Sequence, residues 1–364
     1  MRHWRWAVVY GGVAALVSIP VVSANWPVDR PDIGIAELRQ RIATSAQVGF
    51  AGLYESRGGL RLPDLGRYDD EVAPFKSSSR VRVWYAAPDR WRADELLIGA
   101  ERGIYREPGG LWRWDSGTRR IVYSPRSDTE PLRIPRLMDL SPAELGRRLL
   151  ADTVGEEVSS MPPKRIAGQV AAGLRITPVS TTTTIDSVDL WADPQTGVVM
   201  KVQIDTGGTA PVFETAFVAL QFGRPSAAVM QFDPTEVDEP VRQANTADAI
   251  EALSQNTLLP LPDQLAGLPR RGQATGGLVT YGSGLSVVTV LAAPRGSLSR
   301  PGRGIYALPQ TDRPWGGQAI VLETSLFNAQ IISLGIFDIV LAGTVTVPEL
   351  DRIAGQLAEQ GGLF

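Results

Sequence analysis

The sequence contains no cysteine, and its one histidine is His3. The absence of cysteine excludes disulfide bonds, thiol chemistry, cysteine-ligated zinc and a lipid-modified N-terminal cysteine. If export removes the segment that contains His3, the mature chain also lacks the histidine that catalytic triads and many metal sites require. We therefore expect a protein that binds rather than catalyses, with no metal and no cofactor.

Lysine is scarce as well, since only Lys76, Lys164 and Lys201 occur among the 36 lysine and arginine residues. We interpret the preference for arginine as codon bias from a GC-rich genome. The formal net charge is −3, so nothing indicates nucleic-acid binding, which needs a concentrated basic surface. Hydrophobic residues make up 43% of the 364 residues, which allows sizeable cores and is typical of a chain with two domains.

The first 24 residues have the pattern of an export signal. Arg2 and Arg5 precede an apolar run from Trp6 to Val22, and Val22-Ser23-Ala24 offers the small residues that signal peptidase requires. The run is slightly short for a membrane span, which needs about 20 apolar residues. We expect residues 1–24 to be a cleaved signal peptide, with an uncleaved anchor in the cytoplasmic membrane as the alternative. Either interpretation places the rest of the chain outside the cytoplasm.

Helix and strand patterns follow. A short amphipathic helix is predicted over residues 33–46, and a second begins at Ser141, where Pro142 and Glu144 complete a capping-box pattern. Alternating apolar residues between Gly and Pro turns predict an antiparallel sheet with one wet face. Its strands are expected at residues 48–54, 80–85, 91–93, 111–114, 120–123, 172–179, 185–192, 198–204 and 213–222.

A linker is predicted over residues 233–245, where Pro234 and Pro240 flank an acidic stretch. The remainder, residues 246–364, is expected to form a smaller domain. A helix near residues 246–255 opens it, and a capping-box pattern at residues 346–349 begins its closing helix. Its strands are expected at residues 278–281, 285–292, 318–323 and 331–346.

Patterns that indicate catalysis are weak. Gly282-Ser283-Gly284 resembles a nucleophile elbow, but the full spacing is absent and no histidine could activate the serine, so we interpret it as a hairpin turn. The carboxylates of residues 69–71 and of Glu156-Glu157 could form a glycosidase pair only if they converge in space. We interpret both runs as solvated loops, and the threonine run of residues 181–184 as an exposed strand or loop.

Large apolar side chains are concentrated in the first strand group. Trp112 and Trp114 share one face of their strand, because successive side chains alternate and Arg113 lies between them. These side chains are either core beneath the helices or the lining of a cavity for an acyl chain or an apolar peptide. The residues predicted to line such a cavity are Phe50, Val83, Trp91, Trp112, Trp114 and Phe217.

A series of segments can be followed in chain order through both parts. It comprises residues 165–168, 174–178, 188–197, Val202, 213–215, Phe217, 232–234, 261–268, 281–288 and 343–354. This series resembles the two-domain RseB/MucB family of sigma-E regulatory proteins, whose N-terminal domain is similar to the LolA/LolB lipoprotein carriers. The resemblance covers most of the mature chain.

The resemblance implies an α+β fold. An open antiparallel half-barrel covered by helices would span residues 30–232, and a smaller α+β domain residues 246–364. It also implies a regulatory protein without catalytic residues that senses a lipid or an envelope lipoprotein and acts on the extracytoplasmic region of a membrane anti-sigma factor. The alternatives are a carrier of lipid or lipoprotein without a signalling role and a hydrolase of envelope polymers.

Overall fold

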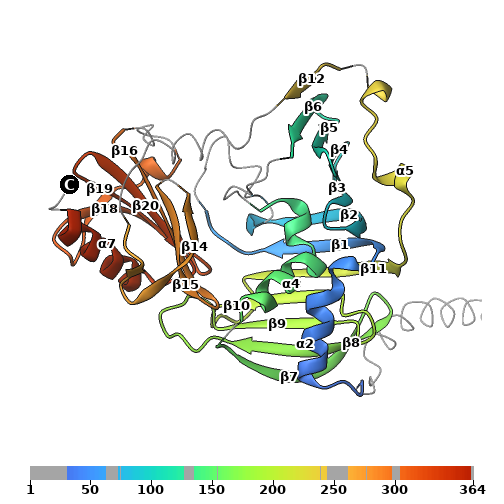
Figure 1. Ribbon diagram of the computed structural model, residues 1–364, viewed down its shortest axis with the longest axis horizontal. Coiled ribbons are helices and arrows are strands. Elements are labelled where there is room, and N and C mark those ends of the chain that lie inside the picture. The colour runs from blue at the N-terminus through green and yellow to red at the C-terminus, as the bar shows by residue number, and fades with distance from the viewer. Residues whose placement is uncertain are drawn as a thin grey trace, which may run out of the picture.

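The computed structural model describes residues 31–62, 73, 75–126, 135–153, 155–237, 239–243, 261–275, 277–296 and 304–361. Three predictions lie outside the described residues: the export segment 1–24, the carboxylate run 69–71 and the helix near residues 246–255. The described strands form one twelve-stranded and one eight-stranded sheet (Figure 1).

The larger sheet joins two antiparallel meanders through the pair β1–β11. Its strands are β1 (Phe50–Gly58), β2 (Ser78–Ala87), β3 (Arg90–Leu97), β4 (Ala100–Glu107), β5 (Gly110–Asp115), β6 (Arg120–Pro125), β7 (Glu157–Ile166), β8 (Gln169–Thr177), β9 (Ser187–Ala192), β10 (Val199–Asp205), β11 (Phe213–Phe222) and β12 (Val241–Gln243). The strand order is β12-β6-β5-β4-β3-β2-β1-β11-β10-β9-β8-β7. Because β7 and β12 remain at the edges, the sheet is open, as predicted.

Short helices cover one face of this sheet, which we call the helix face; the opposite face is the outer face. They are α2 (Ile35–Thr44), η1 (Ser45–Gln47), η3 (Leu137–Leu140) and α4 (Pro142–Ala151). The helix α4 begins where the sequence predicts, because the Ser141 hydroxyl accepts a hydrogen bond from the backbone N–H of Glu144 at 3.3 Å. Gly146 allows a close approach to the sheet, since a Cβ there would lie 2.6 Å from a methyl carbon of Val199.

After β11 the chain crosses the outer face of β3–β6 and ends as β12 beside β6 (yellow in Figure 1). We call this segment, residues 223–237 and 239–243, the strap; it contains α5 (Ala227–Met230) and η4 (Pro234–Glu236). Part of the predicted linker 233–245 is therefore a strand of the larger sheet, paired parallel with β6. The division of the chain into two domains stays a prediction.

The smaller sheet is antiparallel and packs against α7 (Val347–Gly361), which begins where the capping pattern predicts. The prediction of a single strand over residues 331–346 was wrong, because Gly335, at φ 55°, turns the chain between two strands. The strands are β13 (Gln264–Leu265), β14 (Leu268–Thr275), β15 (Leu278–Ser283), β16 (Ser286–Pro294), β17 (Gln310–Asp312), β18 (Gln318–Glu323), β19 (Asn328–Leu334) and β20 (Phe337–Gly343), with η5 (Gly304–Ala307) before β17.

Candidate functional site

The register of the strands separates the six residues predicted to line a cavity. Residues paired directly across neighbouring strands point to the same face. Phe50 pairs with Tyr85, and Tyr85 pairs with Trp91, so these three share the helix face. Val83 lies two residues before Tyr85 on β2, and Phe217 pairs with Tyr54, which is hydrogen-bonded to Leu137 of η3, so both also lie on the helix face.

Trp112 and Trp114 lie on the outer face. Trp112 pairs with Tyr105, which pairs with Arg92, the neighbour of Trp91 on β3. Because successive side chains of a strand alternate between faces, Trp112 points away from Trp91. The structure therefore brings four of the six residues together and places these two tryptophans on the other side of the sheet.

The four residues on the helix face are packed core. Phe50, Val83, Trp91 and Phe217 are 1%, 0%, 8% and 2% exposed. The ring of Phe50 stacks on Tyr85 at 5.0 Å between centroids and meets Phe217 edge-on at 5.6 Å. Met138 of η3 and Ala143 of α4 belong to the same cluster, so the helices cover these side chains.

Two tyrosines tie the covering segments to the sheet. The Tyr54 hydroxyl donates to the carbonyl of Leu137 at 2.5 Å, and the Tyr85 hydroxyl donates to the carbonyl of Ala46 at 2.8 Å. Burial raises the pKa of Tyr54 well above its usual value and the pKa of Tyr85 to about 12. Both phenols therefore stay protonated at physiological pH and can keep donating these hydrogen bonds.

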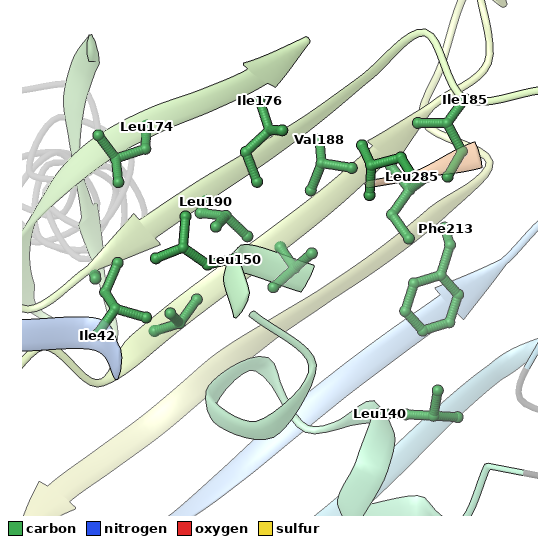
Figure 2. Close-up of a cluster of buried hydrophobic side chains, with 14 of the residues drawn as sticks. Ile42, Leu140, Leu150, Leu174, Ile176, Ile185, Val188, Leu190, Phe213 and Leu285 are labelled. Carbon is green, nitrogen blue, oxygen red and sulfur yellow. The ribbon is translucent and has the colours of Figure 1, made fainter. Parts of the chain in front are cut away.

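A second apolar cluster on the helix face extends to the smaller sheet. Leu150 of α4 and Phe213 of β11 belong to a cluster that also contains Leu285 and Leu326. Figure 2 shows Leu285 beside Ile185 and Phe213. Leu285 is 4% exposed, so a residue of the smaller sheet's region is part of the core beneath the helices.

Glu156 links the two sheets through backbone hydrogen bonds. Its carboxylate accepts from the N–H of Val179 at 2.7 Å and from the N–H of Leu285 at 3.0 Å. The sequence interpretation of Glu156-Glu157 as a solvated loop holds for neither residue, because Glu157 begins β7 and Glu156 is half-buried. No local pattern predicts this role, since Glu156 and Leu285 are 129 residues apart.

The threonine run of residues 181–184 completes this link. Thr183 forms an isolated antiparallel bridge with Val345, flanked by backbone hydrogen bonds from Thr184 to Thr344 at 2.9 Å and from Thr346 to Thr182 at 2.8 Å. An ion pair between Arg271 and Asp152 lies across the same boundary. We call Glu156 and residues 182–184 the clamp, because together they hold the smaller sheet against the larger one.

On the outer face, the strap covers the aromatic side chains. The ring of Phe232 lies 5.1 Å from Tyr105 and 5.3 Å from Trp112, between centroids. The carboxylate of Glu107 accepts a hydrogen bond from the backbone N–H of Phe232 at 3.0 Å, and Arg92 donates to the carbonyl of Val229 at 3.3 Å. Trp112 therefore packs against the chain's own strap.

Three buried acids, Asp94, Asp189 and Asp351, are engaged by arginines. Asp94 lies 2.6 Å from the guanidinium of Arg92, and Asp189 and Asp351 accept hydrogen bonds from arginines at 2.7 and 2.9 Å. Among the described residues, no group of three or more His, Cys, Asp or Glu side chains could hold a metal ion. No helix in the described part of the chain is long and apolar enough to cross a membrane.

Neither a family model nor a curated protein matches this chain. Structurally, the chain is similar to MucB. MucB in the MucA/MucB complex of Pseudomonas aeruginosa is 16% identical, with 88% of this chain and 96% of that chain covered and a TM-score of 0.49. A crystal structure of MucB is 17% identical, with 88% and 95% covered and a TM-score of 0.46.

A LolA superfamily protein from Nitrosomonas europaea is also similar, at 12% identity, with 55% of this chain and 99% of that chain covered and a TM-score of 0.25. The structural neighbours therefore include both groups named by the sequence resemblance. At these identities and TM-scores the likeness carries no argument about function.

Asparagine in place of Asp94 should make stability depend less on pH. Burial raises the pKa of Asp94, which hydrogen bonds from Arg92 oppose and the charge of Glu101 reinforces. A raised folded-state pKa contributes stability that is complete below the unfolded value of about 3.9 and is lost as pH rises through the folded value. As the pH rises from about 4 to 7, the urea midpoint of the parent protein should therefore fall by more than that of Asp94→Asn.

Asp115→Asn is the control of opposite sign. Burial alone would raise the pKa of Asp115, but hydrogen bonds from Thr118 outweigh it and hold the pKa below its usual value. Asp115 therefore contributes stability above the unfolded pKa that is lost as pH falls through the folded value. If the parent and Asp94→Asn show the same dependence of stability on pH, the pKa of Asp94 is not raised in the folded protein.

Proposed function

We propose that this chain is an extracytoplasmic binding protein without catalytic activity. It senses a lipid or an envelope lipoprotein in the half-barrel and acts on the extracytoplasmic region of a membrane anti-sigma factor. The observation that carries the proposal is the continuity of the apolar cluster beneath α4 with Leu285 of the smaller sheet's region. A ligand that displaces side chains at one end of this cluster can therefore shift the side chains at the other end.

This coupling between the two ends follows from the packing of the cluster. An acyl chain that enters beneath η3 and α4 must take space from side chains that are almost fully buried, because protein interiors have few voids. The covering helices then have to shift, and Leu150 of α4 shares its cluster with Leu285. A ligand changes a conformational equilibrium only by binding one state better than another. Here the two states would differ in the contacts between α4 and the smaller sheet.

The kind of partner comes from the sequence resemblance, and one structure similar to this chain is MucB in complex with MucA. Extracytoplasmic placement rests on the export pattern of residues 1–24, which lie outside the described residues. The acids paired with arginine are already engaged within the fold, and this favours binding over hydrolysis of envelope polymers.

Native mass spectrometry of the protein extracted from its own envelope tests the proposal. We expect a complex with a membrane anti-sigma factor, and a mature N-terminus at Asn25 or a retained apolar run. A stoichiometric lipid with no protein partner would instead support a carrier. Recovery of the native protein from the cytoplasm, with neither lipid nor partner, would refute both.

A further inference from the structure

Trp191 is a buried tryptophan on the outer face of β9. It is 0% exposed, and its indole N–H donates to the carbonyl of Pro162 at 3.1 Å. Gly173 pairs with it on β8, where a Cβ would lie 2.9 Å from the indole nitrogen. The hydrogen bond and the close backbone therefore hold the ring in one orientation.

Two of the chain's three lysines approach this ring. The ammonium of Lys164 lies 3.7 Å from the ring centroid, and that of Lys201 lies 5.9 Å from it. Lys201 is also paired with Glu214 at 3.0 Å. No carboxylate of the described residues lies within salt-bridge distance of Lys164. In a chain that uses arginine for most of its positive charge, two lysines thus converge on one aromatic side chain.

Of the three neighbouring cations Lys164, Arg175 and Lys201, only Lys164 forms no ion pair with an acid of the described residues. Arg175 and Asp189 neutralise each other through two hydrogen bonds of 2.7 Å. Glu214 neutralises Lys201, with which it forms an ion pair. Asp186 and Asp205 act on Arg175, and neither is paired with Lys164. Lys164 therefore keeps an unpaired ammonium group near that of Lys201.

We propose that Lys164 and Lys201 form a binding site for a phosphate group, with Trp191 as its floor. Ammonium groups bind phosphate oxygens through charge-assisted hydrogen bonds, and Lys is well suited as a point charge for this ligand. A phosphate carries between one and two negative charges near neutral pH, so it would pair with Lys164 and bridge to Lys201. The group could be free phosphate or the phosphate of a lipid headgroup.

The acid–base behaviour of Lys164 agrees with this geometry. Burial lowers the pKa of Lys164, and the positive charge of Lys201 lowers it further, against the opposing effects of Asp189 and Glu214. A bound anion would favour the charged form and raise the pKa again. The site therefore has a readout that does not depend on knowing the protein's activity.

Nuclear magnetic resonance of the full chain, labelled with ¹³C at the lysine Cε, tests this site, because only three side chains contribute signals. With inorganic phosphate added at constant ionic strength, we expect the pKa of Lys164 to rise by about 1, the lower end of the effect of a neighbouring opposite charge. The Lys201 signal should shift in the same titration, and Lys76 should not respond. A uniform response of all three lysines, or none, would overturn the proposal.

Variants separate the site from general charge effects. Lys164→Met should abolish the response of Lys201 to phosphate, whereas the matched control Lys76→Met should leave it intact. The source of the phosphate is tested by sedimentation with vesicles of phosphatidylglycerol or phosphatidylcholine. Binding to phosphatidylglycerol alone, lost in Lys164→Met, identifies a lipid headgroup. A response to inorganic phosphate without vesicle binding identifies the free ion, and failure of both probes overturns the site.

Discussion

Replacing Phe50 with alanine is expected to lower the free energy of unfolding by about 3–5 kcal/mol, the usual cost of truncating a buried phenylalanine. Phe50 is 1% exposed, and its ring contacts both Tyr85 and Phe217. Losing these ring contacts adds to the free energy that is lost with the buried apolar surface. Urea unfolding followed by circular dichroism measures the change. The site prediction can then be examined with Phe50→Leu, which keeps an apolar side chain and should remain folded.

If Phe50, Val83, Trp91 and Phe217 bind an acyl chain, Phe50→Leu should weaken binding of a fluorescent fatty acid while the protein stays folded. The control is Trp114→Ala, because Trp114 lies on the outer face and is only half-buried. It should change acyl-chain binding little. Unchanged binding in Phe50→Leu together with lost binding in Trp114→Ala would place the ligand on the outer face instead. No binding by the parent protein would leave the four residues as core alone.

Replacing Glu156 with glutamine is expected to split thermal unfolding into two transitions. The carboxylate accepts hydrogen bonds from two backbone N–H groups, and a glutamine amide can accept only through its single oxygen. A hydrogen bond to a charged group is worth about 1.5–3 kcal/mol, so this amount of coupling between the sheets should be lost. Differential scanning calorimetry should show the smaller sheet melting before the larger one.

Glu157→Gln provides the matched control, because Glu157 is the next residue and its side chain is exposed. A surface change of this kind alters stability by less than about 0.5 kcal/mol. Glu157→Gln should therefore melt as the parent does. If Glu156→Gln also melts in one transition at the parental temperature, the clamp does not hold the sheets together.

Local patterns predicted elements whose signals lie within a few residues. The strands β11 and β18 have the predicted bounds, since apolar alternation and flanking turns define both ends. The helix α4 begins after Ser141 because its cap uses adjacent side-chain and backbone groups. The hairpin β19–β20 was missed because both of its strands are apolar and only Gly335 marks the turn.

The candidate site could be predicted only in part. Alternation correctly placed Trp112 and Trp114 on one face of their strand, but which face depends on pairing through β3 and β4. A shift by one residue exchanges the two faces of a sheet, so an assignment made strand by strand cannot be carried across several strands. Phe50, Val83, Trp91 and Phe217 came together because their strands pair in the register observed.

The sequence by itself determined that this chain forms antiparallel sheets with a few amphipathic helices, because periodicity and capping are local properties. It also excluded cysteine chemistry through composition alone. Only the tertiary structure decided that Glu156 reaches Leu285, that the strap covers Trp112 and that Lys164 lies over Trp191. The physical reason is that each of these contacts joins residues far apart in the chain. Their proximity depends on how the strands pair and the sheets pack, which no local sequence pattern specifies.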